Sequence, residues 1–167
     1  MWLGLSGQFR ARWSARIHEE WKRNLLLKRS DLSRQQLNRT SALMDQAIPD
    51  ALVTDFESLI VGLSLPDADD RHVLAAAIRC NASVIVTFNE RDFPESALSP
   101  FGVEAQHPDR FIENLFDLDP NAVVGAAQRQ RAQLKRPPMT VDRYLEVLLR
   151  QGLAQTVRAL APCRSVL

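Results

Sequence analysis

The segment LPDADDRHVLAAAIRCNASVIVTFNERDF, residues 65–93, carries the clearest pattern in the chain. It opens with three aspartates within positions 67–70 and continues as an apolar run with helical spacing. Asn81 is expected to end this helix, because asparagine tolerates the left-handed backbone conformation. Residues 83–87, SVIVT, are short, β-branched and apolar on both faces. Such a run predicts a buried strand of a parallel sheet.

Polar residues follow this predicted strand directly, from Asn89 to Asp92. Open α/β sheets bind ligands outside the carboxyl ends of their strands, next to helix starts. Here the predicted helix begins with acidic residues and the predicted strand is followed by acidic residues, so both groups are expected at that edge of the sheet. Clustered carboxylates without a glycine-rich loop favour a divalent cation over a phosphate group. The sequence therefore predicts a cation site next to residues 67–70.

The sequences DADDRHVLAAAI, residues 67–78, and VIVTFNERDF, residues 84–93, resemble the C-terminal half of a PIN domain. They are most similar to VapC-like toxins, and the likeness extends over roughly residues 5–115. The resemblance implies an α/β fold with a parallel sheet flanked by helices, and a Mg²⁺-dependent ribonuclease. We predict a PIN-like nuclease domain over residues 1–117 and a helical C-terminal extension over residues 118–167.

PIN domains normally begin with an apolar strand that carries an aspartate of the metal site. This chain has no acidic residue before Glu19. The resemblance therefore implies that the first strand and its aspartate are missing, and that activity depends on supplying them. Residues 1–9 are expected to be the tail of a helix that ends near Gly7, and residues 10–13 a short strand.

Ser14 is a suitable N-cap for a helix from Ala15 to about Lys28. Residues spaced four apart predict the buried stripe of this helix: Ile17, Trp21 and Leu25. Judged from charge patterning alone, the two glutamates of this helix are solvated surface acids. The resemblance instead implies that Glu20 belongs to the metal site, with Glu19 as the alternative.

The resemblance implies three catalytic acids that also bind the metal: Glu20, Asp70 and Asp92. Asp67 and Asn89 are added as further metal ligands, and Asn89 is also the alternative to Asp92. Any single aspartate of positions 67–70 could instead be a helix cap. The implied cofactor is Mg²⁺, with Mn²⁺ as the alternative.

Two histidines stand close to these acids in the sequence. His72 follows the acidic cluster, and we weigh a contact with substrate phosphate against a structural role. His18 precedes the glutamates, but Lys22 stands where a zinc-protease motif would need its second histidine. His18 is therefore expected to pack or lie at the surface rather than bind a metal.

Composition limits the class of protein. The 167 residues are 46% hydrophobic and 25% charged, which is ordinary for a soluble globular domain. A net charge of +1 offers no global polycation, so any RNA attraction must come from local basic patches. Cys80 and Cys163 stand apart, as expected for a reducing cytoplasm. No apolar run is long enough to span a membrane.

Helices are also expected outside the 65–93 segment. One begins after Asp31 or Ser33 and runs to about Ile48. In toxins of this type the corresponding helix pair commonly binds an antitoxin, and the alternative is that its exposed side is a plain solvated face. In the C-terminal third, a helix from Asn121 to about Leu134 leads into a predicted basic ridge, formed by Arg129, Arg131, Lys135 and Arg136.

The resemblance implies an endoribonuclease toxin of a type II toxin–antitoxin pair. Its expected partners are an RNA substrate, a cognate antitoxin and a second copy of the chain, with no membrane. The first alternative is a non-catalytic PIN scaffold that binds an antitoxin or RNA. The second alternative is a different α/β phosphohydrolase, such as a phosphatase.

Overall fold

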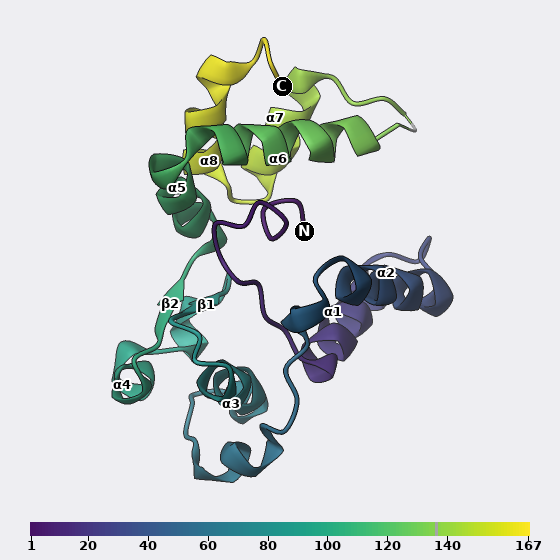
Figure 1. The fold of residues 1–167 in the computed structure, drawn as a ribbon. Coiled ribbons are helices and arrows are strands. Elements are labelled where there is room, and N and C mark those ends of the chain that lie inside the picture. The colour runs from purple at the N-terminus through teal and green to yellow at the C-terminus, as the bar shows by residue number, and fades with distance from the viewer. Residues whose placement is uncertain (136) are drawn as a thin grey trace. The chain divides into compact units, whose positions relative to one another are not determined.

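We analysed a computed structural model of the chain, which describes residues 1–135 and 137–167 (Figure 1). Two compact units can be distinguished. The central unit consists of residues 10–85 and 89–105, and the C-terminal unit consists of residues 1–9, 86–88 and 106–167. The predicted domain boundary after residue 117 stays a prediction.

A small sheet links the segments on either side of α4, Glu95–Leu98. Strand β1, Val84–Val86, lies beside strand β2, Glu104–Gln106 (Figure 1). The Glu104 N–H donates to the Ser83 carbonyl at 2.9 Å, and the Thr87 N–H donates to the Gln106 carbonyl at 3.0 Å. This pattern makes the pair parallel, so the α/β fold expected from the sequence is confirmed. β1 is less buried than predicted, because the Val86 side chain is exposed.

The core of the central unit forms around α3, Arg71–Arg79. Leu74 and Ala75 of this helix are fully buried. Asn81 takes the left-handed conformation at φ 52°, which confirms it as the helix stop. The other core residues come from the loops and short turns around α3 and from both strand regions: Val53, Phe56, Leu63, Ile85, Phe93, Leu98 and Val103.

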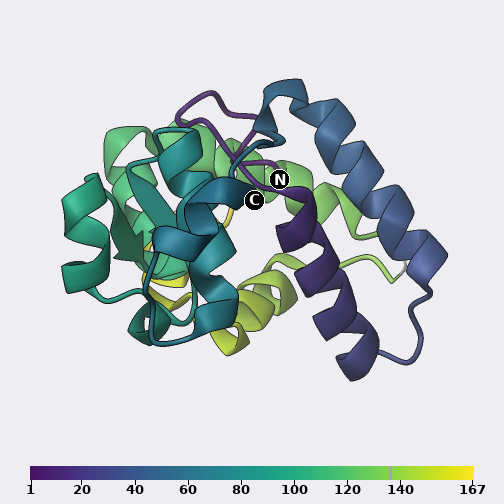
Figure 2. The ribbon, with the colours of Figure 1, turned by 90° about the horizontal axis from the view of Figure 1, so that it is seen from below.

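Helices α1, Ala15–Lys28, and α2, Arg34–Ala47, form a hairpin and lie side by side in both views (Figures 1 and 2). Ser14 caps α1, as predicted. Of the two predicted alternatives for α2, Ser33 is the cap, and it forms a reciprocal capping box with Gln36.

The predicted buried stripe of α1 is wrong. His18 and Lys22 are the buried residues of this helix, whereas Leu25 is exposed. The polar ends of both side chains have partners, since Asp45 accepts from His18 at 3.0 Å and Asn38 from Lys22 at 3.1 Å. Tertiary hydrogen bonds therefore override the apolar periodicity on which the prediction depended.

The chain before α1 is less regular than predicted. Residues 2–5 form turns instead of the expected helix tail. Trp13 and Leu52 form an isolated parallel bridge, in place of the short strand expected at residues 10–13. The Trp13 N–H donates to the Ala51 carbonyl at 2.9 Å, and the Val53 N–H donates to the Trp13 carbonyl at 2.8 Å.

Short 3₁₀ turns connect the longer elements of the central unit. Two of them flank Leu52 and the loop after it, at Pro49–Ala51 and Glu57–Gly62. Two others carry predicted site residues, at Ala68–Asp70 and Glu90–Asp92. A fifth, Ser99–Phe101, leads from α4 towards β2.

The C-terminal unit contains four α-helices in its described residues: α5, Pro108–Leu118; α6, Pro120–Gln133; α7, Val141–Arg150; and α8, Ala154–Leu160. A 3₁₀ turn, Ala161–Cys163, follows them. Their apolar core includes Leu115, Val123, Tyr144, Leu148 and Leu160. The helical prediction for this region is confirmed.

The predicted basic ridge is wrong at Arg131. Its guanidinium donates to the Leu167 carbonyl at 2.6 Å and to the Met139 carbonyl at 2.8 Å, so it ties together the last helices. Arg129 and Lys135 are exposed, and Arg136 lies outside the described residues. Among the described residues, no helix has the length and apolar character needed to cross a membrane.

Candidate metal centre

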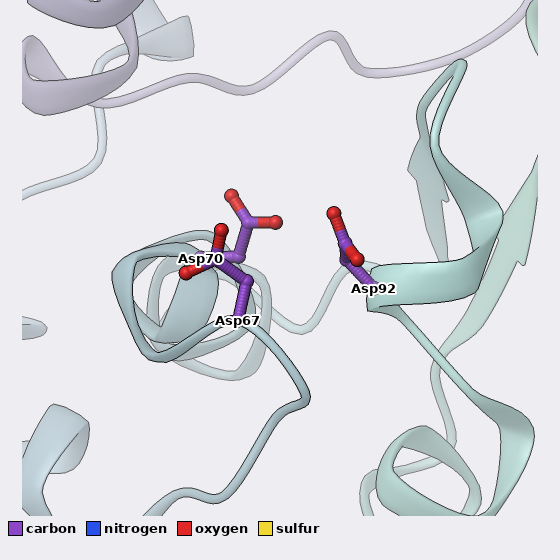
Figure 3. Close-up of side chains that lie close together, drawn as sticks. All are labelled: Asp67, Asp70 and Asp92. Atoms are coloured by element: carbon purple, nitrogen blue, oxygen red, sulfur yellow. The ribbon is translucent and has the colours of Figure 1, made fainter.

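Three carboxylates of the central unit converge from two segments of the sequence, residues 67–70 and residue 92. Asp67 and Asp70 come from the turn that leads into α3, and Asp92 comes from the turn after β1 (Figure 3). Each offers one oxygen, and these oxygens all lie within 4.8 Å of one another. The helix start and the strand end therefore meet, as the sequence predicted.

Local capping distinguishes the two aspartates before α3. Asp67 caps the turn Ala68–Asp70, because its Oδ1 accepts the Asp69 N–H at 2.8 Å. Asp70 stands at the N-cap position of α3, but its side chain makes no capping hydrogen bond. The Asp70 carboxylate therefore faces its acidic neighbours without the backbone donors that an N-cap usually receives.

The surroundings of Asp70 disfavour its charged form. Burial is the main cause, and neighbouring carboxylates add to it, so the pKa of Asp70 rises to about 6. The contributing carboxylates are Asp67, Asp92, Glu20 and Asp69. A cation bound among them would reverse this effect by favouring the ionised form.

Asn89 reaches the same cluster through Asp92. It precedes the turn Glu90–Asp92, and its side-chain amide donates to the Asp92 carboxylate. The sequence left these two residues as alternatives for one position, but the structure brings both there. Asp92 is the member of the pair that belongs to the group of converging carboxylates.

Glu20 approaches the cluster from α1. Its Oε1 lies 2.7 Å from Nε2 of His72, and its charge contributes to the raised pKa of Asp70. Glu20 is not among the residues whose oxygens lie within 4.8 Å of one another in the part of the chain that the structure describes. Glu19 is engaged elsewhere, in ion pairs with Lys22 at 2.5 Å and with Arg34.

His72 is fully buried, at 0% exposure, in the first turn of α3. The expectation that it contacts substrate phosphate is therefore wrong, and its other predicted role, a structural one, fits its position. Burial lowers the pKa of His72, against the effect of the Glu20 carboxylate, which by itself would raise it.

An open pocket of about 400 Å³ borders Glu20 and Asp69. Three arginines line it, of which Arg16 and Arg23 come from α1 and Arg34 comes from α2. Glu19 also lines the pocket and forms an ion pair with Arg34, so the lining holds three arginines and three acids. Sequence reasoning missed this group of arginines. The spacing of Arg16, Glu20 and Arg23 at i, i+4 and i+7 was an available sign that they share one helix face, but the contribution of Arg34 depends on the hairpin.

The chemistry of the donor set fits a hard divalent cation. The converging ligand atoms are all carboxylate oxygens, which Mg²⁺ and Mn²⁺ accept, and no cysteine or histidine belongs to the group among the described residues. Burial and, after it, the neighbouring carboxylates raise the pKa of Asp70, and such a cation would neutralise the charge of those carboxylates. Asp67, Asp70 and Asp92 can therefore hold a metal, whose identity the donor set does not fix.

Two family profiles match the chain. A family profile described as PIN domain matches residues 1–91, more than half of the chain. A second profile, the VapC50 C-terminal domain, matches residues 108–162. No solved structure matches the chain.

One curated relative is similar over the region of 98 residues in which it aligns. The putative ribonuclease VapC50 of Mycobacterium tuberculosis (strain ATCC 25618 / H37Rv) is 40% identical there. The matched region covers 58% of this chain and 58% of that protein. Because the PIN domain profile covers over half of the sequence, including Glu20 and Asp70, the chain belongs to the PIN domain family.

Proposed function

We propose that this chain is a Mg²⁺-dependent endoribonuclease, the toxin of a type II toxin–antitoxin pair, which acts on RNA in the cytoplasm. The observation that carries the proposal is the group of oxygens from Asp67, Asp70 and Asp92, all within 4.8 Å of one another, in a member of the PIN domain family. The name of the mycobacterial relative, a putative ribonuclease, supports the same activity.

We assign metal binding to Asp70 and Asp92 as the main ligands, with Asp67 beside them. Glu20 is the proposed fourth acid, and Asn89 orients Asp92 through its amide. Mg²⁺ is the proposed cofactor, with Mn²⁺ as a substitute. When bound, a divalent cation would supply Lewis acidity, activation of water and stabilisation of charge that develops on phosphate.

The arginine-lined pocket is the proposed binding surface for the RNA backbone. Arg16 and Arg23 present guanidinium groups next to Glu20, and guanidinium binds phosphate oxygens in a fixed, bidentate geometry. Arg34 lines the same pocket and is paired with Glu19. Contacts from Arg16 and Arg23 would hold a phosphodiester at the edge of the carboxylate cluster. Binding would weaken as salt rises, because phosphate contacts release counterions.

Water is the proposed nucleophile. His72 follows the acidic cluster in the sequence, but its burial keeps its ring away from any substrate. A covalent route needs a nucleophilic side chain activated by a base that can reach it, and His72 cannot serve as that base. The mechanism that fits these residues is direct hydrolysis, with the carboxylates holding the cation and the arginines holding the RNA.

The α1–α2 hairpin is the proposed antitoxin-binding surface. Leu27 of α1 is 81% exposed, and Leu43 of α2 is 54% exposed. Exposed leucines on a helical pair suit the apolar face of an amphipathic partner segment. The arginines of the same hairpin would add charge complementarity to an acidic partner.

Cleavage of end-labelled single-stranded RNA tests the nuclease proposal, with the 167-residue chain and with the same chain extended before Met1 by an apolar strand that carries an aspartate. We expect cleavage with Mg²⁺ or Mn²⁺, none with EDTA, and strong loss of cleavage in Asp70→Asn and Asp92→Asn. Asp117→Asn is the matched control, because it makes the same chemical change at an exposed residue of α5. A p-nitrophenyl phosphate assay run in parallel reports any phosphatase activity.

Three results would contradict the proposal. Cleavage that persists in EDTA or in Asp70→Asn would show that the carboxylate cluster is not needed for the reaction. Binding of RNA and metal without any cleavage would select the non-catalytic scaffold. Hydrolysis of the phosphomonoester without cleavage of RNA would select the phosphatase alternative.

A further inference from the structure

A buried histidine holds the proposed fourth acid of the metal site. His72 is fully buried two residues after Asp70, and its Nε2 lies 2.7 Å from Oε1 of Glu20. This hydrogen bond joins α3 to α1, two helices that otherwise carry separate parts of the proposed site.

The proton on this hydrogen bond can be assigned from its partners. The ionised Glu20 carboxylate only accepts hydrogen bonds, so Nε2 of His72 carries the proton. The other ring nitrogen, Nδ1, is buried and has no partner among the described atoms. The geometry therefore assigns the donor of this hydrogen bond to the Nε2–H of His72 and leaves Nδ1 buried without a partner.

The unpartnered Nδ1 needs an explanation beyond packing. A buried nitrogen without a partner is unfavourable. An apolar ring of similar size would fill the same space without this cost. The feature that a histidine adds here is the Nε2–H that reaches Glu20. Carboxylates that bind metals are commonly held by such outer hydrogen bonds, which fix their orientation.

We propose that His72 is a positioning residue, whose Nε2–H holds the Glu20 carboxylate beside the cluster of Asp67, Asp70 and Asp92 so that Glu20 binds the same cation. The inference rests on the proposed function, because it requires a metal at this cluster. One oxygen of Glu20 receives the hydrogen bond, and the carboxylate has a second oxygen for the cation.

Calorimetric titration with Mn²⁺ alone tests the inference without relying on cleavage. His72→Phe removes the donor and keeps a buried ring. His72→Gln is the matched variant, because its side-chain amide can place an N–H close to the position of Nε2. We expect His72→Phe to lower Mn²⁺ affinity by about tenfold to a hundredfold, the usual effect of removing such a partner. His72→Gln should stay close to the wild type.

A double-mutant cycle with Glu20→Ala tests whether His72 affects Mn²⁺ affinity through Glu20. If His72 acts through Glu20, His72→Phe should add little further loss of Mn²⁺ affinity in the Glu20→Ala background. An equal loss in both backgrounds would overturn the inference. So would a His72→Phe protein that is less stable to heat but binds Mn²⁺ as the wild type does, since that result describes a purely structural residue.

The ring itself provides a readout on the wild-type protein, should His72→Phe fail to fold. Long-range ¹H–¹⁵N correlation spectra are expected to show a proton on Nε2 of His72. A ring protonated only at Nδ1 has no Nε2–H to donate to Glu20 and would overturn the inference. A wild-type chain that binds no Mn²⁺ would overturn it together with the metal site, whereas Mn²⁺ binding without RNA cleavage would contradict only the proposed function.

Discussion

Asp70 of the central unit and Asp109 of the C-terminal unit are the same chemical group in opposite surroundings. Asp109 is 5% exposed, and it accepts hydrogen bonds at 2.7–2.8 Å from the Gln155 N–H, the Thr156 N–H and the Thr156 hydroxyl. Asp70 stands at the start of α3 without a capping hydrogen bond and faces other carboxylates. Both begin helices, but only one of them has its charge satisfied by the protein.

Their pKa values move in opposite directions for this reason. Burial by itself would raise both, as it does for any carboxyl group. At Asp109 the donors from Thr156 and Gln155 outweigh burial and hold the pKa below its usual value. At Asp70 burial and the acidic neighbours act together and raise the pKa to about 6. A buried carboxylate with donors stabilises the fold, whereas one among other carboxylates is suited to a cation.

The largest expected difference between Asp70 and Asp109 is the effect of their substitution on the stability that Mn²⁺ adds. At a Mn²⁺ concentration of 100 times Kd, the wild type should gain about 2.7 kcal/mol by mass action, seen as a higher thermal midpoint. Asp70→Asn should lose most of this gain, because it removes a ligand charge. Asp109→Asn should keep the gain, although its own midpoint is lower. Equal Mn²⁺ effects in both variants would contradict the distinction.

Removal of the Asp109 carboxylate should destabilise the C-terminal unit. Asp109→Ala leaves three donors at the start of α8 without their acceptor, and we expect a loss of about 2–3 kcal/mol in urea unfolding. Because its folded pKa is lowered, this stabilisation is present above the ordinary value of 3.8 and is lost as the pH falls through the lower folded value.

Asp117→Ala is the control for this effect, since Asp117 is an exposed residue of the same helix. Hydrogen exchange at the amides of Gln155 and Thr156 adds a local readout, because both amides donate to Asp109. If exchange at these amides were unchanged in Asp109→Ala, the assigned role of the carboxylate would be wrong.

The two aspartates also mark what the sequence could and could not predict. Helix caps depend on residues three positions apart, so Ser14 and, as one of two alternatives, Ser33 could be named from the sequence, and the structure confirms both. The meeting of the acidic segments 67–70 and 89–92 followed from local pattern, since it needs only that a helix start and a strand end share one edge. The choice of Asp70 and Asp92 within those segments came from the family resemblance.

Long-range contacts explain what the sequence could not predict. Asp109 was not singled out, because its partner Thr156 lies 47 positions away. His72 stands beside the acidic cluster, but its burial against Glu20, 52 positions away, depends on how α1 meets α3. The buried face of α1 was assigned wrongly for a related reason, since Asp45 and Asn38 of α2 supply the partners that allow His18 and Lys22 to be buried.

The smallest expected effect is a gain of stability from removing the Asp70 charge in the absence of metal. A folded pKa raised to about 6 means that the folded state resists ionisation, so this group stabilises the fold below pH 3.8 and that contribution is lost as pH rises through about 6. Asp70→Asn should therefore stabilise the protein at pH 7.5 in EDTA by about 1 kcal/mol, a value reduced for the partial exposure of the group.

Urea unfolding at two pH values measures this gain, with Asp117→Asn as the matched control at an exposed position. The gain from Asp70→Asn should largely disappear at pH 3.5, where the wild-type carboxyl group is protonated in the folded state and mostly protonated in the unfolded state. Saturating Mn²⁺ at pH 7.5 should reverse the order, because the cation then favours the ionised aspartate. If Asp70→Asn were the less stable protein in EDTA at pH 7.5, Asp70 would be a structural acid like Asp109, and the assignment of its cluster to a cation would lose its electrostatic basis.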